Sequence, residues 1–297
     1  MNIGFIGLGT MGGSTAKNIV KKGSEKVIMF DASPACREKF RAEGYTVVDS
    51  YMDFAEAEVI FLCVPDTEIV KNILFGEDSL KSVLHAEQIV VDLSTIKYNA
   101  TLEIKDKLSS MGVDFLDSPI SGMAARAVTG DLAVMVGGSE EIFMKVKSIL
   151  ERFGTNIQYM GDTGSGQLTK LINQLLFDIN LAGMAEIMPF AVKMGLDPEK
   201  VTSIVNTGTG RSFATEQFLP KILKGVFMGG YPMAKAYKDL VSAAEITASN
   251  NLTLPVLSAA IGTYQMALLK GYGDADKGIM IKVFEELFGV EFRAGGK

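Results

Sequence analysis

The chain has 297 residues, of which 47% are hydrophobic, and its formal net charge is −6. This composition is ample for buried cores in one large domain or two ordinary ones. A nucleic-acid partner is disfavoured, because no basic stripe is available to neutralise phosphates. Cys36 and Cys63 form no C-x-x-C motif, and the N-terminus lacks the basic region and cleavage site of a signal peptide. We therefore expect a cytoplasmic protein without a bound metal.

The chain up to about residue 162 alternates short apolar runs with helical patterns, which is typical of a parallel sheet covered on both faces. Ser33 and Pro34 supply a helix N-cap and a proline at the first helical position, and Gly44 follows where that helix is expected to end. We predict a Rossmann-type, doubly wound, mostly parallel α/β domain over residues 1–162. Its expected strands are 2–7, 26–31, 46–48, 58–64, 88–93, 113–117, 132–136 and 156–160.

After Gly161 only helical patterns follow. Gly164 and Gly166 precede a long predicted helix that ends near Gly195. We therefore predict that residues 163–297 form an all-helical domain for substrate binding and oligomerisation, entered by this long interdomain helix. Its further helices are expected at 198–205, 214–224, 233–250, 256–269 and 276–288.

The long apolar run at 171–194 is too polar for a membrane span, because a bilayer core tolerates charged and amide side chains poorly. It is expected to be a buried helix, and no membrane partner is predicted. The polar residues in this run are Asn173, Asp178, Glu186 and Lys193.

The segment GFIGLGTMG matches G-x-G-x-x-G where a predicted strand gives way to a predicted helix. Gly7 allows the tight turn, Gly9 lets a pyrophosphate approach the backbone, and Gly12 packs the helix against the strand. Asp31 closes the second predicted strand, where a carboxylate can accept both ribose hydroxyls. The sequence therefore predicts dinucleotide binding, with backbone contacts that include Leu8, Thr10 and Met11.

Asp31 favours NAD, because a 2′-phosphate beside it would meet like-charge repulsion. NADP stays open, since Arg37 lies close in the sequence, although a solvated helix-face charge is the more ordinary role for that residue. Ligands of open α/β sheets bind beyond the carboxyl ends of the strands, so two later strand ends, CVPDT and DLSTI, should also face the cofactor. The cofactor-facing residues expected there are Cys63, Val64, Pro65 and Thr95, with Cys63 acting as a small apolar residue rather than a nucleophile.

A dehydrogenase also needs an acid/base group for the hydroxyl proton. The single histidine, His85, precedes a predicted strand and is expected on the surface at the opposite edge of the sheet. Elimination leaves Lys170 in GSGQLTKLINQ, with Asn173 on the same helix face and apolar neighbours that would desolvate the ammonium. The alternative interpretation is a lysine that extends from the start of a helix to water.

The segment DSPISGMAARAVTG, at 117–130, follows another predicted strand. Ser121 and the backbone amides beside Gly122 could hold a carboxylate in a turn. Arg126 could form a bidentate pair with a carboxylate or sulfonate. From spacing alone, a glycine-rich surface loop with a solvated arginine is an equally good interpretation.

These segments together resemble the β-hydroxyacid dehydrogenases of the 3-hydroxyisobutyrate dehydrogenase and tartronate semialdehyde reductase type. The resemblance covers nearly the whole chain. GFIGLGTMG resembles the dinucleotide motif of the family, DSPISGMAARAVTG its substrate motif, GSGQLTKLINQ its catalytic motif, and KDLVSAAE at 238–245 its second cofactor motif.

The resemblance implies a role for each matching residue. Lys170 matches the lysine that removes the hydroxyl proton during oxidation and returns it during reduction, and Asn173 matches the asparagine that orients the substrate. Ser121 and Gly122 match positions that hold the substrate carboxylate. The remaining matches are Thr95 and Lys238 as cofactor contacts, Asp239 as support for Lys238, and Phe213 as a pocket wall.

Two departures from the family pattern put the identity of the substrate in doubt. Met123 stands where the family usually has a second glycine, which adds a side chain beside the carboxylate site. Gln174 stands where a second asparagine commonly follows the first.

The sequence thus predicts NAD-linked reversible oxidation of a short, anionic β-hydroxy acid to its semialdehyde. Met123 and Arg126 leave open a related aldehyde that bears a sulfonate or a second carboxylate. A different class, a sensor that binds NAD without turnover, would need the glycine loop but not a desolvated lysine. Excess apolar helical surface predicts an oligomer, and the resemblance implies a homodimer or homotetramer.

Overall fold

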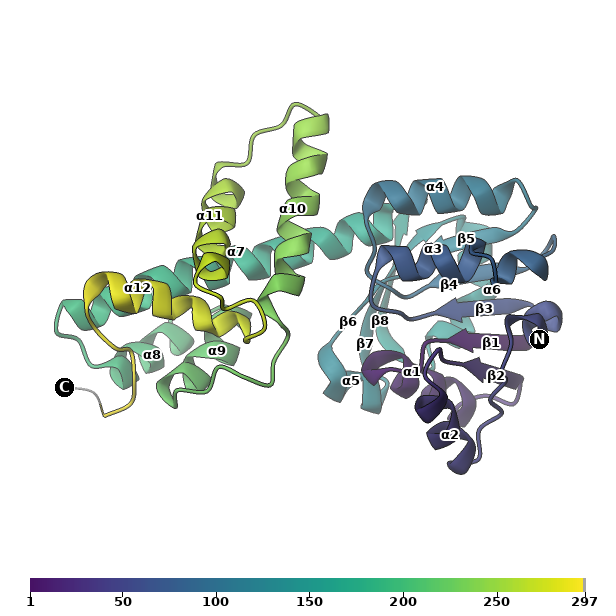
Figure 1. The fold of residues 1–297 in the computed structure, drawn as a ribbon, viewed down its shortest axis with the longest axis horizontal. Coiled ribbons are helices and arrows are strands. Elements are labelled where there is room, and N and C mark those ends of the chain that lie inside the picture. The colour runs from purple at the N-terminus through teal and green to yellow at the C-terminus, as the bar shows by residue number, and fades with distance from the viewer. Residues whose placement is uncertain (296–297) are drawn as a thin grey trace. The chain divides into compact units, whose positions relative to one another are not determined.

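The computed structural model describes residues 1–295 and contains two compact units, Met1–Lys170 and a second unit that begins at Leu171. The division lies inside one long helix, α7 (Ser165–Lys193), a few residues beyond the boundary expected near residue 162 (Figure 1). The first turn of α7 belongs to the first unit because its backbone is tied to that unit's sheet. Gly164 N–H and Gln167 N–H both donate to the carboxylate of Asp117.

The first unit is built on an eight-stranded, mostly parallel sheet. Five parallel strands lie in the order β2-β1-β3-β4-β5, and β7 runs antiparallel to β5 and β6 and parallel to β8. This confirms the predicted fold class. The strands are β1 (Asn2–Ile6), β2 (Lys26–Phe30), β3 (Val59–Leu62), β4 (Ile89–Asp92), β5 (Asp114–Asp117), β6 (Ile120–Ser121), β7 (Leu132–Gly138) and β8 (Gly154–Gly161).

Two strand assignments differ from the sequence prediction. Residues 46–48 were expected to form a strand, but they form only an isolated bridge between Met29 and Val47. This run is too short to continue the pairing along β2. The strand β6 was not predicted, because its two residues carry no periodic pattern and exist as a strand only through their pairing with β7.

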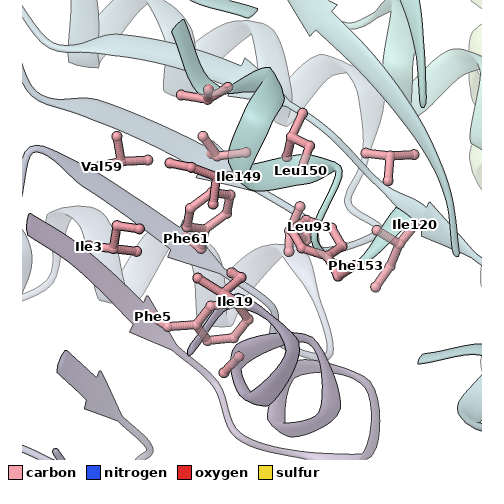
Figure 2. Close-up of a cluster of buried hydrophobic side chains, with 14 of the residues drawn as sticks. Ile3, Phe5, Ile19, Val59, Phe61, Leu93, Ile120, Ile149, Leu150 and Phe153 are labelled. Atoms are coloured by element: carbon pink, nitrogen blue, oxygen red, sulfur yellow. The ribbon is translucent and has the colours of Figure 1, made fainter. Parts of the chain in front are cut away.

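Alternating side chains of the parallel strands fill cores on both faces of the sheet. On β3, Val59 and Phe61 pack with α1 and α6, whereas Ile60 and Leu62 pack with α3 and α4. Figure 2 shows part of the first core, where Ile19 of α1 lies against Phe5 of β1. The helices of this unit are α1 (Thr10–Lys21), α2 (Pro34–Ala42), α3 (Thr67–Phe75), α4 (Tyr98–Ser109), α5 (Met123–Thr129) and α6 (Glu140–Leu150), with 3₁₀ turns at Tyr51–Glu56 and Leu80–Ser82.

The described part of the second unit contains helices and no strand, as predicted. The predicted helix at 276–288 is divided into a 3₁₀ turn, Lys277–Met280, and α12. The core of this unit holds a buried ion pair, in which Lys277 Nζ lies 2.5 Å from Asp178 Oδ1. The helices after α7 are α8 (Pro198–Thr207), α9 (Phe213–Leu223), α10 (Met233–Ser249), α11 (Pro255–Leu269) and α12 (Ile281–Phe288).

Helix α7 is long and apolar enough to cross a bilayer by length and composition, and 44% of its most apolar window is buried inside the protein. One face of α7 forms part of the core of the second unit through Leu181, Ala185 and Met188. Asp178, on the same helix, is fully buried and paired with Lys277. These contacts are those of a core helix in a globular domain.

Candidate functional site

The glycine loop lies at the point where the order of the sheet reverses. The strands that follow β1 in sequence, β2 and β3, pair with opposite edges of it, so the loops after β1 and β3 flank a topological switch point. Ligands of open α/β sheets bind at such points, beyond the carboxyl ends of the strands. The structure therefore places Gly7–Gly12 and Cys63–Pro65 side by side at the position that a dinucleotide requires.

Each glycine of the loop meets a different geometric demand. Gly7 has φ +97°, and a Cβ there would lie 2.3 Å from the carbonyl oxygen of Cys63. A Cβ on Gly12 would lie 2.0 Å from the carbonyl oxygen of Gly7. Gly9, in contrast, has open space where its Cβ would be, and it caps α1 without a side-chain hydrogen bond. Gly7 and Gly12 are thus required by the fold, and Gly9 leaves room for a phosphate to approach the helix N-terminus.

The carboxylate of Asp31 lies against the glycine loop. Its Oδ2 accepts a hydrogen bond from Leu8 N–H at 2.7 Å, and its Oδ1 accepts one from Ser33 N–H at 2.8 Å. The acidic residue at the end of β2 is therefore held beside the turn that approaches the pyrophosphate. This placement fits a dinucleotide whose adenosine ribose reaches Asp31.

Arg37 is not the solvated helix charge that its sequence context suggested. Its side chain is only 16% accessible, and its Nε lies 2.9 Å from Asp49 Oδ1. Its Nη1 donates to the main-chain oxygen of Asp31 at 2.7 Å. Arg37 thus stabilises the turn after β2, next to Asp31.

The other strand ends expected to face the cofactor are joined to each other and to α7. Val64 N–H donates to Ser94 Oγ at 2.9 Å, which connects the ends of β3 and β4. The side-chain amide of Gln167, on α7, bonds to the residues on either side of the exposed Thr95. Its oxygen accepts from Ile96 N–H, and its nitrogen donates to the carbonyl oxygen of Ser94.

The remaining residues of these segments have distinct environments. Burial raises the pKa of the Cys63 thiol to about 12, so a thiolate nucleophile is disfavoured there. Pro65 is exposed beside it. His85, also exposed, precedes β4, and its ring nitrogens lie near the carbonyl oxygens of Ala86 and Ala55. This histidine is a surface residue, as predicted.

Lys170 lies on α7, and only 8% of its surface is exposed. It is thus a buried residue, and the alternative in which it extends into water is wrong. The position of Lys170 depends on the start of α7, which is anchored by Asp117. Oδ1 of this carboxylate accepts from Gly164 N–H at 2.7 Å, and Oδ2 accepts from Gln167 N–H at 2.8 Å. Asp117 begins the predicted substrate segment, so one carboxylate fixes both that segment and the helix of Lys170.

A second buried acid lies beside this anchor. Asp92 ends β4 and is the register partner of Asp117 in β5, and both side chains are fully buried. Burial raises the pKa of Asp92 to about 7 and that of Asp117 to about 6. Asp92 Oδ1 accepts from Ser94 N–H, while its Oδ2 and the hydroxyl of Ser118 have no partner among the described residues. Both acids lie at the carboxyl ends of their strands, at the same edge of the sheet as the loops that carry the other predicted site residues.

The predicted substrate segment forms β6 and the short helix α5. Gly122 has φ +148°, and a Cβ there would contact the side chains of Leu132 and Arg126. Met123 has φ +64°, a left-handed conformation that side chains rarely adopt, and its side chain is 58% exposed. Ser121, in β6, is half-buried just before this turn.

Arg126 is on α5 but is already paired. Its Nε lies 3.0 Å from Asp131 Oδ2, and about half of its side chain is accessible. Asp131 also accepts a hydrogen bond from Thr155. An anion that binds to Arg126 would therefore have to use the guanidinium edge that Asp131 leaves free.

The other predicted site residues belong to the second unit. Asn173 is exposed on α7, one turn after Lys170. Phe213 begins α9 with about half of its surface exposed, and its ring packs edge-on against Phe177 with centroids 5.5 Å apart. Lys238 is exposed on α10, where Asp239 is half-buried.

Sequence reasoning missed Asp117 and Gln167 as site residues. Asp117 begins the predicted substrate segment and Gln167 lies within the predicted catalytic segment, but the sequence assigns neither residue a role. Both act through hydrogen bonds between segments that are 47 to 73 residues apart in the chain. No local pattern in the sequence marks either residue, because their partners lie in other segments.

Comparisons with known proteins match both halves of the chain. Residues 2–161 match the family model of the NAD binding domain of 6-phosphogluconate dehydrogenase. Residues 164–284 match the model described as the NAD-binding region of NADP-dependent 3-hydroxyisobutyrate dehydrogenase.

Relatives of known name match over nearly the full length. A 2-(hydroxymethyl)glutarate dehydrogenase from Eubacterium barkeri is 35% identical, covering 99% of this chain and 98% of its own. The mitochondrial 3-hydroxyisobutyrate dehydrogenase of Mus musculus is 32% identical over 92% of this chain and 84% of its own.

Solved structures agree with these matches. A 3-hydroxyisobutyrate dehydrogenase from Salmonella typhimurium superimposes with a TM-score of 0.85 at 28% identity, covering 96% of this chain and all of its own (100%). An imine reductase from Myxococcus stipitatus, at 19% identity and a TM-score of 0.64 over 95% of this chain and 98% of its own, shares the fold.

Proposed function

Because the chain belongs to the β-hydroxyacid dehydrogenase family, we propose that it reversibly oxidises a short β-hydroxy acid to its semialdehyde with a nicotinamide cofactor. The single observation that carries this proposal is the burial of Lys170 on a helix anchored to the substrate segment. A lysine without a role in the site would ordinarily be exposed to solvent. A buried amine beside strand ends that face a dinucleotide is suited to proton transfer.

The reaction divides the substrate's two hydrogens between two acceptors. The bound nicotinamide supplies the acceptor for the hydride that leaves the carbinol carbon. Lys170 in its neutral form accepts the hydroxyl proton during oxidation, and its ammonium returns that proton to the carbonyl oxygen during reduction. Asn173, on the same helix one turn later, donates or accepts a hydrogen bond that orients the reacting oxygen.

The carboxylate of the substrate is assigned to the turn after β6. Ser121 offers a hydroxyl donor there, and the glycine at 122 permits a backbone conformation that other residues rarely adopt. Lys238 is assigned to the cofactor, with Asp239 supporting it and Phe213 forming a pocket wall. These roles rest on the family motifs and on the positions of the residues within their own units.

NAD is the proposed cofactor in preference to NADP. The support is the carboxylate of Asp31, which is held against the glycine loop and would repel a 2′-phosphate on the adenosine ribose. Arg37 is engaged with Asp49 and with the main chain of the same turn. We also propose a cytoplasmic location and a homo-oligomeric assembly.

The replacement of Lys170 tests the proposal. We expect Lys170→Ala to lower kcat by at least about a hundredfold, because general acid/base catalysis typically contributes that much, and to leave the Kd for NAD nearly unchanged. The assay is nicotinamide absorbance with a panel of short β-hydroxy acids, and Kd is measured by titration calorimetry. Lys170→Arg is the matched control, since arginine keeps the positive charge but cannot release its proton; it should be equally inactive.

Comparable turnover in Lys170→Ala would remove lysine from the mechanism. A wild-type protein that binds NAD but turns over no hydroxy acid or aldehyde in the panel would instead support a nucleotide sensor.

A second candidate substrate class is a hydroxy acid or aldehyde with an additional anionic group. The observations that favour it are the guanidinium of Arg126 near the substrate turn, and the similarity to a relative whose name specifies a glutarate, which is a dicarboxylate. If this class is correct, Arg126→Ala should raise KM for dicarboxylate substrates about tenfold or more and leave monocarboxylate substrates unaffected. A KM for dicarboxylates that is unchanged from the wild type in Arg126→Ala, or a KM that changes equally for both substrate classes, would eliminate this candidate.

A further inference from the structure

The second unit contains a buried ion pair to which the reaction assigns no role. Lys277, on the 3₁₀ turn before α12, and Asp178, on α7, are 2% and 0% exposed. Lys277 Nζ lies 2.5 Å from Asp178 Oδ1, and the hydroxyl of Tyr264, on α11, donates to the same oxygen at 2.8 Å. Apolar residues of similar volume often stabilise a core as well as a buried ion pair does, because the two charges lose their hydration. Stability is therefore a weak reason for this pair.

The ammonium of Lys277 also lies over an aromatic ring of α7. Its Nζ is 3.9 Å from the centroid of the Phe177 ring, which is within the range of a cation–π contact. Asp178 follows Phe177 directly in the helix, so a carboxylate and a ring from adjacent positions contact the same ammonium. The ion pair thus fixes the cation, and the cation restrains the ring.

The Phe177 ring in turn contacts the predicted pocket wall. It packs edge-on against Phe213, with centroids 5.5 Å apart, and lies tilted against Phe218 at 6.0 Å. The residue after Lys277 contacts Phe218 as well, because a Cβ on Gly278 would lie 2.8 Å from that ring. Phe218 is buried, whereas about half of Phe213 is exposed. Phe213 is therefore the ring with the most freedom to turn, and its contact with Phe177 limits that freedom.

Phe177 lies on the face of α7 that carries the catalytic motif. At about 100° per residue it is about 20° from Lys170 and about 40° from Asn173 around the helix. One face of this helix thus presents, in order, the proposed base, the orienting amide and the ring that contacts Phe213.

The buried ion pair also has a neighbour in the second cofactor motif. Burial raises the pKa of Tyr264, and the charges of Asp178 and Asp239 raise it further. Burial and the same two carboxylates raise the pKa of Tyr231. Asp178 and Asp239 are thus close enough to act on the same two phenols. The ion pair therefore lies among the predicted site residues of this unit.

We propose that Lys277 is a positioning residue that sets substrate preference by holding the Phe177 ring against Phe213. Lys277 is too buried to contact the substrate itself, and it acts through the two rings. Phe213 then presents a fixed apolar wall to an alkyl group on the carbon between the carboxylate and the carbinol carbon. This inference rests on the reaction stated under Proposed function, and it assigns the preference for a branched β-hydroxy acid to a named group.

The preference for a branched over an unbranched acid tests this role. The measured ratio is kcat/KM for 3-hydroxyisobutyrate divided by that for 3-hydroxypropionate, which lacks the methyl branch, and it should exceed one in the wild type. Asp178→Asn, Lys277→Met removes both charges together, so no buried charge is left unpaired, and the asparagine keeps an acceptor for Tyr264. We expect the ratio to fall about tenfold through KM for the branched acid, since one methyl group in an apolar pocket is worth about that much. The kcat for the unbranched acid should stay within about twofold of the wild type.

A second ion pair in the same unit supplies the matched control. Glu285 and Arg293 lie 2.6 Å apart, and Arg293 lies over the ring of Phe227 instead of Phe177. Glu285→Gln, Arg293→Met should leave the ratio unchanged. A purely structural role of the Lys277 pair would lower the melting temperature in both double variants and leave the ratio unchanged in both.

Phe177→Leu removes the ring and leaves the ion pair in place. It should lower the ratio by a similar factor. Its combination with Asp178→Asn, Lys277→Met should cause little further change, because both alterations interrupt the same chain of contacts. Circular dichroism establishes that each variant is folded. An unchanged ratio in Phe177→Leu or in the folded double variant, or full additivity in the triple variant, would overturn the positioning role.

The failure of this inference and that of the enzymatic proposal are distinguishable. A wild type that turns over no hydroxy acid would remove both. A wild type that turns over these acids without favouring the branched one would remove the positioning role alone, and so would an unchanged ratio in the variants.

Discussion

Met123 has a left-handed backbone, φ +64°, immediately after the residues assigned to the substrate carboxylate. A side chain in this conformation costs roughly 1–2 kcal/mol, and glycine does not incur that cost. We expect Met123→Gly to raise the free energy of unfolding by up to about 1 kcal/mol, because the gain is partly offset by the entropy of glycine in the unfolded chain. Urea denaturation measures this change.

The same substitution should alter substrate selection, because it removes an exposed side chain beside Ser121. KM for branched hydroxy acids should fall relative to that for unbranched ones. Met123→Ala separates the two effects, since alanine shortens the side chain but retains the strained backbone. If Met123→Gly and Met123→Ala have the same stability, the strain assigned to this residue is absent.

Individual site residues were predictable where their role is local. Gly7 and Gly12 followed from the geometry of one turn, and Asp31 from its place at the end of the next strand. Asp117 and Gln167 were not predictable as site residues, because their partners come from other strands and loops. The pairing of Arg126 with Asp131, in contrast, is local, because the two residues are five positions apart across the left-handed turn at Gly130.

At the scale of the element, the glycines in the turn between β1 and α1 have different roles. Gly12 is required by the fold, whereas Gly9 is expected to matter only for cofactor binding. Gly9→Ala should leave the melting temperature within about 2 °C of the wild type, because the added Cβ meets no atom within 4 Å. It should weaken NAD binding about tenfold or more, since the methyl group occupies the space through which the pyrophosphate approaches.

Gly12→Ala is the matched comparison, because its Cβ would lie 2.0 Å from the carbonyl oxygen of Gly7. We expect this variant to lose both stability and NAD binding. Differential scanning calorimetry and fluorescence titration with NADH measure the two properties. Unchanged NADH affinity in Gly9→Ala would contradict the assignment of this loop to the pyrophosphate.

Helices and long strands were predicted well because the periodic spacing of their apolar residues is visible in consecutive residues of the sequence. The expected start of α2 at Ser33 and Pro34 is confirmed by the hydrogen bond from Cys36 N–H to Ser33 Oγ. The prediction of a strand at 46–48 is wrong, and β6 was not predicted. Both outcomes depend on the length over which a neighbouring strand is available for pairing. Such pairing is a property of the assembled sheet.

At the scale of the whole molecule, the acid pair under the strand ends links stability to pH. Burial raises the pKa of Asp92 to about 7 and that of Asp117 to about 6, above their ordinary value near 4. The folded state therefore binds more protons than the unfolded state between about pH 4 and pH 7. This contribution to stability is complete below about pH 4 and is lost as pH rises to about 7.

Asp92→Asn should remove the part of this dependence that belongs to Asp92, which amounts to at most about 4 kcal/mol across the window. The measurement is the free energy of unfolding in urea from pH 5 to pH 8, with the exposed Asp106→Asn as the matched control. The variant should show a shallower fall in stability with rising pH than the wild type. An identical slope in Asp92→Asn and wild type would show that this carboxyl is ionised throughout.

The sequence by itself determined the class of each half of the molecule, the dinucleotide turn, and the helix that carries Lys170. These features depend on short-range backbone geometry and on the spacing of apolar residues, which neighbours along the chain specify. Only the tertiary structure decided that Asp117 anchors α7, that Lys170 is buried, and which face of α7 stays exposed. Those outcomes depend on which side chains exclude water from one another, and the residues responsible are distant in sequence.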